Sequence, residues 1–478
     1  MIFTSILYIA FFTLAVTIYF ALPYTLRWIF LLLASLLFYC FGNPQYIWLL
    51  PTIIIINYLG AIIIARSKKD LHKRAVLFLT ALSSLGFLLY YKYAVYFSEI
   101  AFVSLNLFGV SVFQRLYDIA LPLGISFFTF KAIGYTIDVY RGETAPEYHI
   151  GRYSLFVAMF PQLLAGPIDR AGYLLPQIRE NSDFDYERVS WGLSRIFWGL
   201  FKKIVIADRL ALYVNQVYGS PEEHIPLALI IAVYFYSFQI YLDFSAYTDI
   251  AVGSARVFGF KIMENFTYPY FAVSIPDFWR RWHISLSTWF RDYVYIPLGG
   301  NRVPKYRWFL NLFITFFLIG LWHGSNPTFI FWGILNCLYY YVSQLKRGVS
   351  AQIEHYLGAD STLLRASRIL ITFHLVSFAW IFFRAESIDE AFVYLSLMFR
   401  NVSVPCGIDA GLGVFNLIFS IVLVGGYVCV ESLACREKMK ERIARIPFIV
   451  KAIVFTFLLG FMLFFGVFEE TDFIYFRF

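Results

Sequence analysis

The sequence predicts an all-α, polytopic membrane protein that forms one domain over residues 1–478. Three observations lead to this fold class. Hydrophobic residues make up 60% of the chain and charged residues 15%, whereas soluble proteins average about 45–50% and about 25%. Long apolar segments recur along the chain, and the basic residues gather in short loops between them. We expect about 10–12 spans, with some re-entrant and interfacial helices.

The apolar segments are the expected spans, because a helix that crosses a bilayer needs about 20 mostly apolar residues. They cover residues 3–21, 26–41, 46–65, 75–97, 119–136, 192–207, 226–247, 308–322, 328–344, 368–383, 413–433 and 448–468. Several are too short to span alone. The first has no Lys or Arg before Arg27, so we expect a retained helix rather than a signal peptide.

The basic residues indicate orientation rather than a nucleic-acid partner, although the formal net charge is +8. Cytoplasmic loops of membrane proteins are enriched in Lys and Arg. The basic stretches are 66–74, 201–203, 301–307, 346–347 and 436–445. If 66–74 and 436–445 are cytoplasmic, three spans before the first and one span after the last place both termini outside the cytoplasm.

Ionisable residues within spans are costly and often functional. Lys131, Asp138, Asp243 and Asp249 are such residues, and His374 lies in a later apolar run. We expect the two aspartates to line a tunnel or to pair with Arg256 or with hydroxyl groups, and His374 to serve packing. The five cysteines show no metal-ligand spacing, so we expect buried thiols, no disulfide framework and no metal site.

The segment 276–300 has the pattern of one amphipathic helix that lies at the membrane interface and ends at the turn PLGGN (297–301). Ser274 and Asp277 resemble a capping box, and Pro276 suits the first turn. Aromatic and aliphatic residues recur at helical spacing from Phe278 to Tyr293. The other face carries Arg280, Arg281, Ser285, Thr288, Arg291 and Asp292. His283 flanks the apolar stripe, which directs it inward.

His323 follows an apolar run and precedes a break in the helix. Fifteen helical residues from Trp308 cover about 22 Å of a hydrocarbon core about 30 Å thick, so His323 should lie deep. Gly324, Ser325, Asn326 and Pro327 then open the backbone. Non-helical backbone at this depth is tolerated only where protein buries it or where it lines a wet cavity. The sequence therefore predicts a histidine in a cavity wall, unless the ring serves only helix packing.

Six motifs, in order along the chain, resemble the membrane-bound O-acyltransferase (MBOAT) family. They are PLGISFFTFKAIGYTIDVYRG (122–142), FPQLLAGPIDR (160–170), YLDFSAYTDIAVGSARVFGF (241–260), PDFWRRWHISLSTWFRDYVYIPLGG (276–300), GLWHGSNPTFIFWG (320–333) and WIFFRAES (380–387). The branch that acetylates alginate and peptidoglycan is the most similar, and residues 122–344 carry most of the motifs. The resemblance implies a helical bundle around a central tunnel, with His323 as the active-site histidine and His283 as a second one.

On this resemblance we expect a transferase that moves acetyl across the bacterial inner membrane for O-acetylation of an exopolysaccharide or peptidoglycan. His323 would act as general base, and acetyl-CoA is the expected donor, with no bound cofactor. Arg280, Arg281, Arg302 and Lys305 could meet the donor's phosphates. The expected partners are membrane lipid and an extracytoplasmic SGNH-type acetyltransferase, since the sequence contains no serine nucleophile elbow.

The tail at 470–478, which ends in FIYFRF, is expected outside the cytoplasm. Its aromatic residues suit either an interfacial belt or burial in a funnel. By analogy with the D-alanylation system, Tyr475 is a candidate acyl relay.

Three rival functions stay open. D-alanyl transfer to teichoic acid belongs to the same family. A polysaccharide transporter or flippase would need polar groups spread over many spans, whereas here they concentrate in two motifs. A noncatalytic scaffold would be insensitive to loss of His323.

Overall fold

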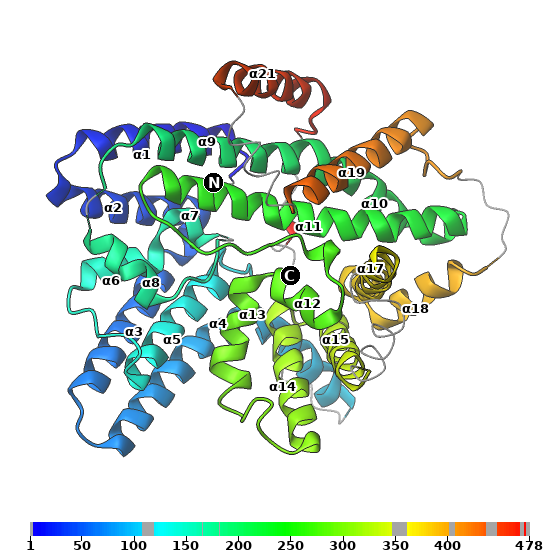
Figure 1. Cartoon of the computed structure of the whole chain (residues 1–478). Coiled ribbons are helices and arrows are strands. Elements are labelled where there is room, and N and C mark those ends of the chain that lie inside the picture. The colour runs from blue at the N-terminus through cyan, green and yellow to red at the C-terminus, as the bar shows by residue number, and fades with distance from the viewer. Residues whose placement is uncertain are drawn as a thin grey trace. The chain divides into compact units, whose positions relative to one another are not determined.

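The computed structural model describes residues 3–107, 119–164, 166–180, 182–346, 361–400, 407–435, 447–468 and 473–474. All regular secondary structure in these residues is helical (Figure 1). The predicted all-α class is therefore confirmed. Each of the twelve apolar segments coincides with a helix or with most of one.

The chain divides into two compact units, of which the first comprises Met1–Phe197, Tyr247–Glu264 and Thr288–Val294. Its helices are α1 (Ile6–Ala21), α2 (Tyr24–Gly42), η1 (Pro44–Tyr46), α3 (Leu49–Arg66), α4 (Asp70–Leu107), α5 (Ile125–Arg141), α6 (Ile150–Ala158), α7 (Phe160–Leu163), α8 (Ala171–Arg179) and most of α9 (Tyr186–Phe201). It also contains the end of α11 (Pro226–Val257) and parts of α13 (Ile284–Phe290) and η5 (Arg291–Tyr295).

The second unit comprises Trp198–Ala246, Asn265–Ser287 and Tyr295–Phe478. It contains most of α11 and the start of α13, and its own helices are η2 (Lys202–Ala207), α10 (Asp208–Gly219), η3 (Pro221–Glu223), η4 (Pro269–Phe271), α12 (Ile275–Arg281), α14 (Lys305–His323), α15 (Pro327–Leu345), α17 (Thr362–Arg384), α18 (Ile388–Leu397), α19 (Val414–Ala434) and α21 (Phe448–Phe465).

Six stretches among the described residues are long and apolar enough to cross a membrane. They are Tyr24–Gly42, Pro44–Arg66, Asp70–Ser104, Pro226–Val257, Thr362–Arg384 and Val414–Ala434. The chain is thus a multi-pass membrane protein. The total of about 10–12 spans stays a prediction.

Polar side chains join α3, α4 and α5 within the first unit. Asn57 is fully buried, and its amide donates to Ser84 Oγ at 2.8 Å. Thr136 Oγ1 in turn donates to Asn57 Oδ1 at 2.9 Å. Interhelical hydrogen bonds of this kind stabilise helix association where lipid removes the hydrophobic driving force.

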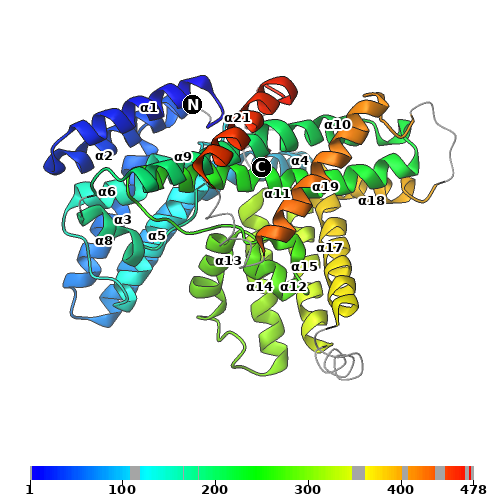
Figure 2. The ribbon, with the colours of Figure 1, turned by 45° about the horizontal axis from the view of Figure 1, so that its top comes forward.

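Close backbone approach joins α14 and α15 in the second unit, where the two helices lie side by side in Figures 1 and 2. A Cβ atom on Gly320 would lie 2.5 Å from the carbonyl oxygen of Phe329, and one on Gly333 would lie 2.5 Å from that of Phe316. Only glycine fits at these two positions without displacing a backbone. The pair therefore fixes how α15 returns along α14 after the break.

The prediction of one amphipathic helix over 276–300 is wrong. Ser274 caps α12 by accepting from Asp277 N–H, and the Asp277 carboxylate accepts from Val273 N–H rather than from Ser274, but α12 ends at Arg281 and α13 begins at Ile284. Asn265 and Thr267 occupy the break: the Asn265 carbonyl accepts from Ile284 N–H at 2.9 Å, and Thr267 N–H donates to the Arg281 carbonyl at 3.0 Å. These bonds replace helical ones, and His283 takes a left-handed φ of 42°.

The basic stretch 201–203 is not the exposed loop that the charge pattern predicted. Lys202 and Lys203 are buried in the π-helical turn η2. Lys202 Nζ donates to Ser245 Oγ at 2.7 Å, and Lys203 pairs with two aspartates. Buried charges need such partners, and the partners come from distant parts of the sequence.

Candidate active site

His323 is the last residue of α14, where the predicted break occurs. Gly324 leaves the helix in extended conformation, and Asn326 starts the next helix by accepting from Thr328 N–H at 3.0 Å. The Asn326 amide also donates to the carbonyl of Glu386. Asn326, predicted as a polar residue of the tunnel, is therefore a helix cap that also fixes the break to the end of α17.

Aromatic rings surround the His323 imidazole, which is 4% exposed. The ring centroids of Trp322, Trp332 and Phe383 lie 5.0–5.1 Å from it. Trp332 stacks on Trp380 at 5.5 Å and meets Trp279 at 5.7 Å. The aromatic cluster, made of Trp279, Trp322, Trp332, Trp380 and Phe383, thus brings α12, α14, α15 and α17 together around one histidine.

His283 also lies beside Trp322. Its ring centroid is 5.8 Å from that of Trp322, which is itself 5.0 Å from His323. The centroid of Phe244 lies 4.6 Å from that of His283, with the two rings nearly perpendicular. The structure therefore brings the two predicted histidines into one site that shares a single indole.

The backbone at His283 is strained and its side chain is 1% exposed. A non-glycine residue with positive φ is uncommon, and such residues cluster at functional sites. Burial lowers the pKa of His283 from 6.5 to about 3, because a charged imidazole loses its hydration there. The ring is therefore neutral at physiological pH and can accept a hydrogen bond.

The four basic residues predicted to meet the donor differ in their surroundings. Arg281 Nε pairs with Asp277 at 3.0 Å, whereas the Arg280 side chain is 73% exposed and lies 4.0 Å from the same carboxylate. Arg302 and Lys305 are exposed at the start of α14. None of the contacts described for these residues joins the two pairs, so their convergence on one donor stays a prediction.

Asp243 was expected to pair with Arg256 or hydroxyl groups, but its partners are different. Its Oδ1 lies 2.8 Å from Lys203 Nζ, and its Oδ2 accepts from the backbone N–H of Ile474 at 2.8 Å. The neighbouring Phe473 is fully buried, 5.6 Å from Phe244. The start of the FIYFRF motif is thus packed one ring away from His283. Tyr475 itself lies outside the described residues.

Asp249 and Lys131, in the first unit, form structural polar contacts. Asp249 Oδ1 accepts from Arg195 Nε at 2.6 Å, rather than from the expected Arg256. Lys131 donates to the Gln162 side chain, which in turn donates to Asp169. His374 is exposed on α17, where its Nδ1 lies 2.7 Å from the Leu370 carbonyl. The packing role expected for His374 stays a prediction.

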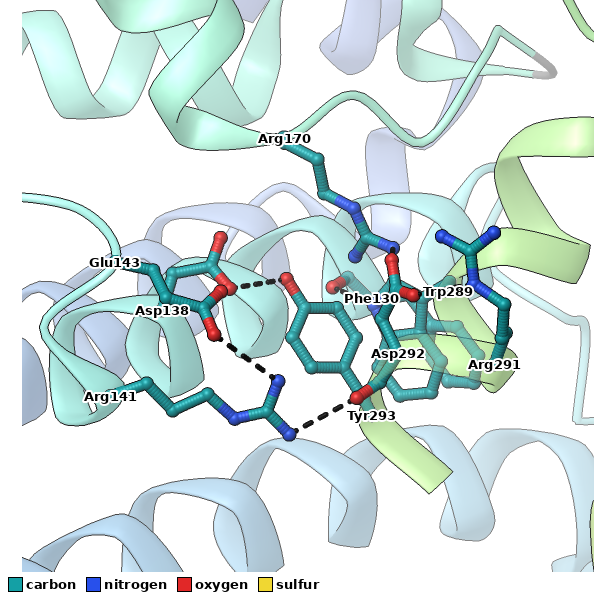
Figure 3. A network of polar contacts seen from close by, with 9 residues as sticks. All are labelled: Phe130, Asp138, Arg141, Glu143, Arg170, Trp289, Arg291, Asp292 and Tyr293. Atoms are coloured by element: carbon teal, nitrogen blue, oxygen red, sulfur yellow. Dashed lines mark hydrogen bonds and ion pairs between the residues drawn. The ribbon is translucent and has the colours of Figure 1, made fainter. Parts of the chain in front are cut away.

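Asp138 belongs to a further polar network in the first unit (Figure 3). Its Oδ1 accepts from the Tyr293 hydroxyl at 2.5 Å. The guanidinium groups of Arg141 and Arg170 lie 5.2 and 4.4 Å from the Tyr293 ring centroid, and Arg170 pairs with Asp292 at 3.0 Å. Arg141 also donates to the Asp292 carbonyl at 3.1 Å. The network therefore ties α5 to residues 291–295 and gives Asp138 a structural partner.

Sequence reasoning missed Asn265, Lys203 and Trp322. Asn265 is fully buried, and its Oδ1 accepts from the Ser285 hydroxyl at 2.6 Å. Lys203 was assigned to a loop because of its charge, although its neighbours in the sequence are apolar. Trp322 precedes His323 directly, and a residue shared by both histidines could be found only after the fold placed them together.

Comparison with known proteins agrees with the family resemblance of the sequence motifs. The model of the membrane-bound O-acyltransferase family matches residues 143–354, a range that contains both histidines. A probable alginate O-acetylase of Pseudomonas aeruginosa is 38% identical over 372 residues, which cover 77% of this chain and 69% of that protein. The peptidoglycan O-acetyltransferase of Helicobacter pylori is 36% identical over an alignment that covers 77% of this chain and 73% of that protein. The teichoic acid D-alanyltransferase of Bacillus subtilis is 30% identical over an alignment that covers 55% of this chain and 69% of that protein.

Proposed function

Because this chain belongs to the membrane-bound O-acyltransferase family, we propose that it moves acetyl across the inner membrane for O-acetylation of a cell-surface polysaccharide. The chain is an acyltransferase with several membrane-spanning helices. Relatives named for acetylation of alginate and of peptidoglycan each cover 77% of it. The polymer that it serves is an alginate-like exopolysaccharide or peptidoglycan.

One observation carries the proposal for the site: His323 and His283 are both buried and flank the same indole, at two interruptions of helical backbone. Interrupted helices deep in a membrane protein are tolerated where they are buried in protein or line a cavity. The imidazole of His323, at the end of α14, is suited by its chemistry to general base catalysis.

The reaction follows from the residue types. A ring nitrogen of His323 takes the proton of the acceptor hydroxyl, and the acceptor oxygen attacks the acetyl carbonyl carbon. The carbon–sulfur bond of the thioester breaks, and the thiolate leaves and takes up a proton. His283 donates or accepts a hydrogen bond that orients the acetyl group. Its ring lies 5.8 Å from Trp322, which in turn lies 5.0 Å from His323.

Acetyl-CoA is the proposed donor, and no cofactor is needed for this chemistry. Arg280 and the exposed Arg302 and Lys305 are available to phosphate groups, whereas Arg281 would have to leave Asp277 or share it. Positive charge in the predicted cytoplasmic loops supports a cytoplasmic donor side and both termini outside the cytoplasm.

The acceptor is proposed to be an extracytoplasmic SGNH-type acetyltransferase, which passes acetyl to the polymer. Tyr475 directly follows Ile474, whose backbone is bound near the site, and it is the candidate relay between the histidines and that partner. Its hydroxyl would take the acetyl group as an ester and release it to the partner's serine. Full polymer acetylation by Tyr475→Phe would exclude the relay.

Acetyl transfer is favoured over D-alanyl transfer because the alignment with the D-alanyltransferase covers 55% of this chain, against 77% for the acetylating relatives. Deletion of the gene tests the choice. Ester-linked acetate released from the surface polysaccharide by mild alkali should fall to background and return on re-expression. Unchanged acetate together with lost D-alanine ester would contradict the proposal, and so would loss of the polymer itself, which indicates a transporter.

A further inference from the structure

The end of α21 and described residues after it are bound at three separate points, one each in α10, η2 and α11. Arg209 Nη2 donates to the carbonyl of Phe465 at 2.6 Å, at the end of the helix. Two residues later, Val467 N–H donates to the carbonyl of Ile204 at 3.0 Å. The third point is the bond from Ile474 N–H to Asp243. Among the described residues after α21, Val467 and Ile474 are therefore both bound to the rest of the second unit.

The π-helical turn η2 makes the second point possible. In a π-helix the backbone bonds run from i to i+5, and such turns occur often at functional sites. Here the Ile204 carbonyl faces the segment leaving α21, and it accepts a bond from outside its own helix. The same turn places Lys203 in the core, where its Nζ lies 2.7 Å from Asp208 and 2.8 Å from Asp243.

The charges at the third point explain why a backbone N–H is bound there. Lys203, Asp208 and Asp243 carry one positive and two negative charges, and their side chains are only 3–6% exposed. A buried carboxylate needs a hydrogen-bond donor for each oxygen. Lys203 serves Oδ1 of Asp243, and Ile474 N–H serves Oδ2. The tail therefore completes the solvation of a buried ion cluster.

The cluster is also adjacent to the histidine site. Phe244, the residue after Asp243, meets His283 at 4.6 Å on one side and Phe473 at 5.6 Å on the other. We infer that Asp243, held by Lys203, is the positioning residue that docks the C-terminal tail beside His283. The docking does not depend on the proposed function, whereas its importance for acetyl transfer rests on that function.

Cysteine accessibility tests the docking without an activity assay. Ile474→Cys is introduced into the full-length chain with its five native cysteines replaced, and the purified protein is reacted with a bulky maleimide. Labelling should be slow in this parent. Asp243→Ala should raise the rate by about tenfold or more, since a tenfold change corresponds to about 1.4 kcal/mol. Ser237→Ala, a buried polar change on the same helix α11, should leave the rate unchanged.

A second variant covers the case in which Asp243→Ala does not fold, because it leaves Lys203 with one partner fewer. Lys203→Met/Asp208→Leu/Asp243→Leu removes all three charges, and apolar replacement of a whole buried ion cluster is often tolerated. It also removes the acceptor for Ile474, so it should expose position 474 equally. Equal labelling of a folded cluster variant and the parent would overturn the inference.

Polymer acetate then reports whether the docking serves the reaction. Removal of residues 473–478 and the cluster variant should each lower acetylation, and their combination should lower it no further, because both act through the tail. Losses that multiply would show that Asp243 acts independently of the tail, and would overturn its role as a positioning residue. If the chain supports no acetylation at all, the labelling result still decides the docking.

Discussion

At His283 a left-handed backbone and a buried imidazole coincide. The conformation is held from outside, by the bonds that Asn265 and Thr267 make to the residues flanking the histidine. Strain of this kind costs about 1–3 kcal/mol and persists only where the surroundings over-determine it. We conclude that the sequence keeps a histidine here for its ring and not for its backbone preference.

Two substitutions separate the ring from the backbone. Asn tolerates the left-handed region, whereas a β-branched residue does not. His283→Asn should therefore retain the melting temperature of the purified protein and lose acetylation, while His283→Val should lose both. Melting temperature and polymer acetate are measured on the same preparations. A His283→Asn protein with full acetylation would show that the ring has no role in the reaction.

The buried ring also predicts a dependence of stability on pH. The folded state holds the pKa of His283 at about 3, against 6.5 in the unfolded chain. Between these values only the unfolded state binds the proton, so the stabilising contribution is complete above pH 6.5 and declines as pH falls toward 3. The melting temperature of His283→Asn should fall less steeply than that of the parent between pH 6.5 and 4. Parallel slopes would contradict the assigned pKa.

Among the helices, the break between α14 and α15 could be predicted and the break between α12 and α13 could not. Gly324 and Pro327 interrupt the first one locally, so the sequence itself carries the signal. The second depends on Asn265 and Thr267, which lie well before it in the chain and bond to it only in the folded protein. Its residues, from Arg281 to Ile284, contain no glycine or proline.

Close packing of α14 on α15 leads to a prediction for Gly320. Gly320→Ala should destabilise the protein by about 1–3 kcal/mol, because its Cβ would overlap the Phe329 carbonyl and force the helices apart. Gly460→Ala in α21 is the matched control: no atom lies within 4 Å of the added Cβ, and alanine is the better helix former. Melting temperatures should move in opposite directions. A neutral Gly320→Ala would mean that the helices are not in close contact.

At the scale of the whole molecule, the composition and the requirements of the bilayer predicted the helical fold. They did not predict the partners of the buried charges. The twelve apolar segments were predicted as helices, because an α-helix satisfies its own backbone hydrogen bonds in lipid, and each falls largely on helical residues. The partners of buried charges were missed because they join distant positions: 54 residues separate Arg195 from Asp249, and 231 separate Asp243 from Ile474. His323 was found because it ends an apolar run at a break in the helix, whereas His283 was assigned as a second site histidine by the family resemblance.

The orientation of the whole chain remains a prediction of the charge pattern. If residues 66–74 face the cytoplasm, Ser67→Cys in a chain without other cysteines should resist a membrane-impermeant maleimide in intact cells. It should react once the membrane is permeabilised, since Ser67 is partly accessible at the end of α3. Rapid labelling in intact cells would invert the proposed orientation and place the termini in the cytoplasm.

The most direct test of the central claim is the acetate content of the surface polysaccharide in cells that carry His323→Ala. His374→Ala provides the control, because His374 is an exposed histidine on α17 of the same unit. With both proteins present in the membrane at the parental level, the account predicts that His323→Ala reduces ester-linked acetate to the level of the gene deletion and that His374→Ala leaves it unchanged. Parental acetate in the His323→Ala cells would contradict the account.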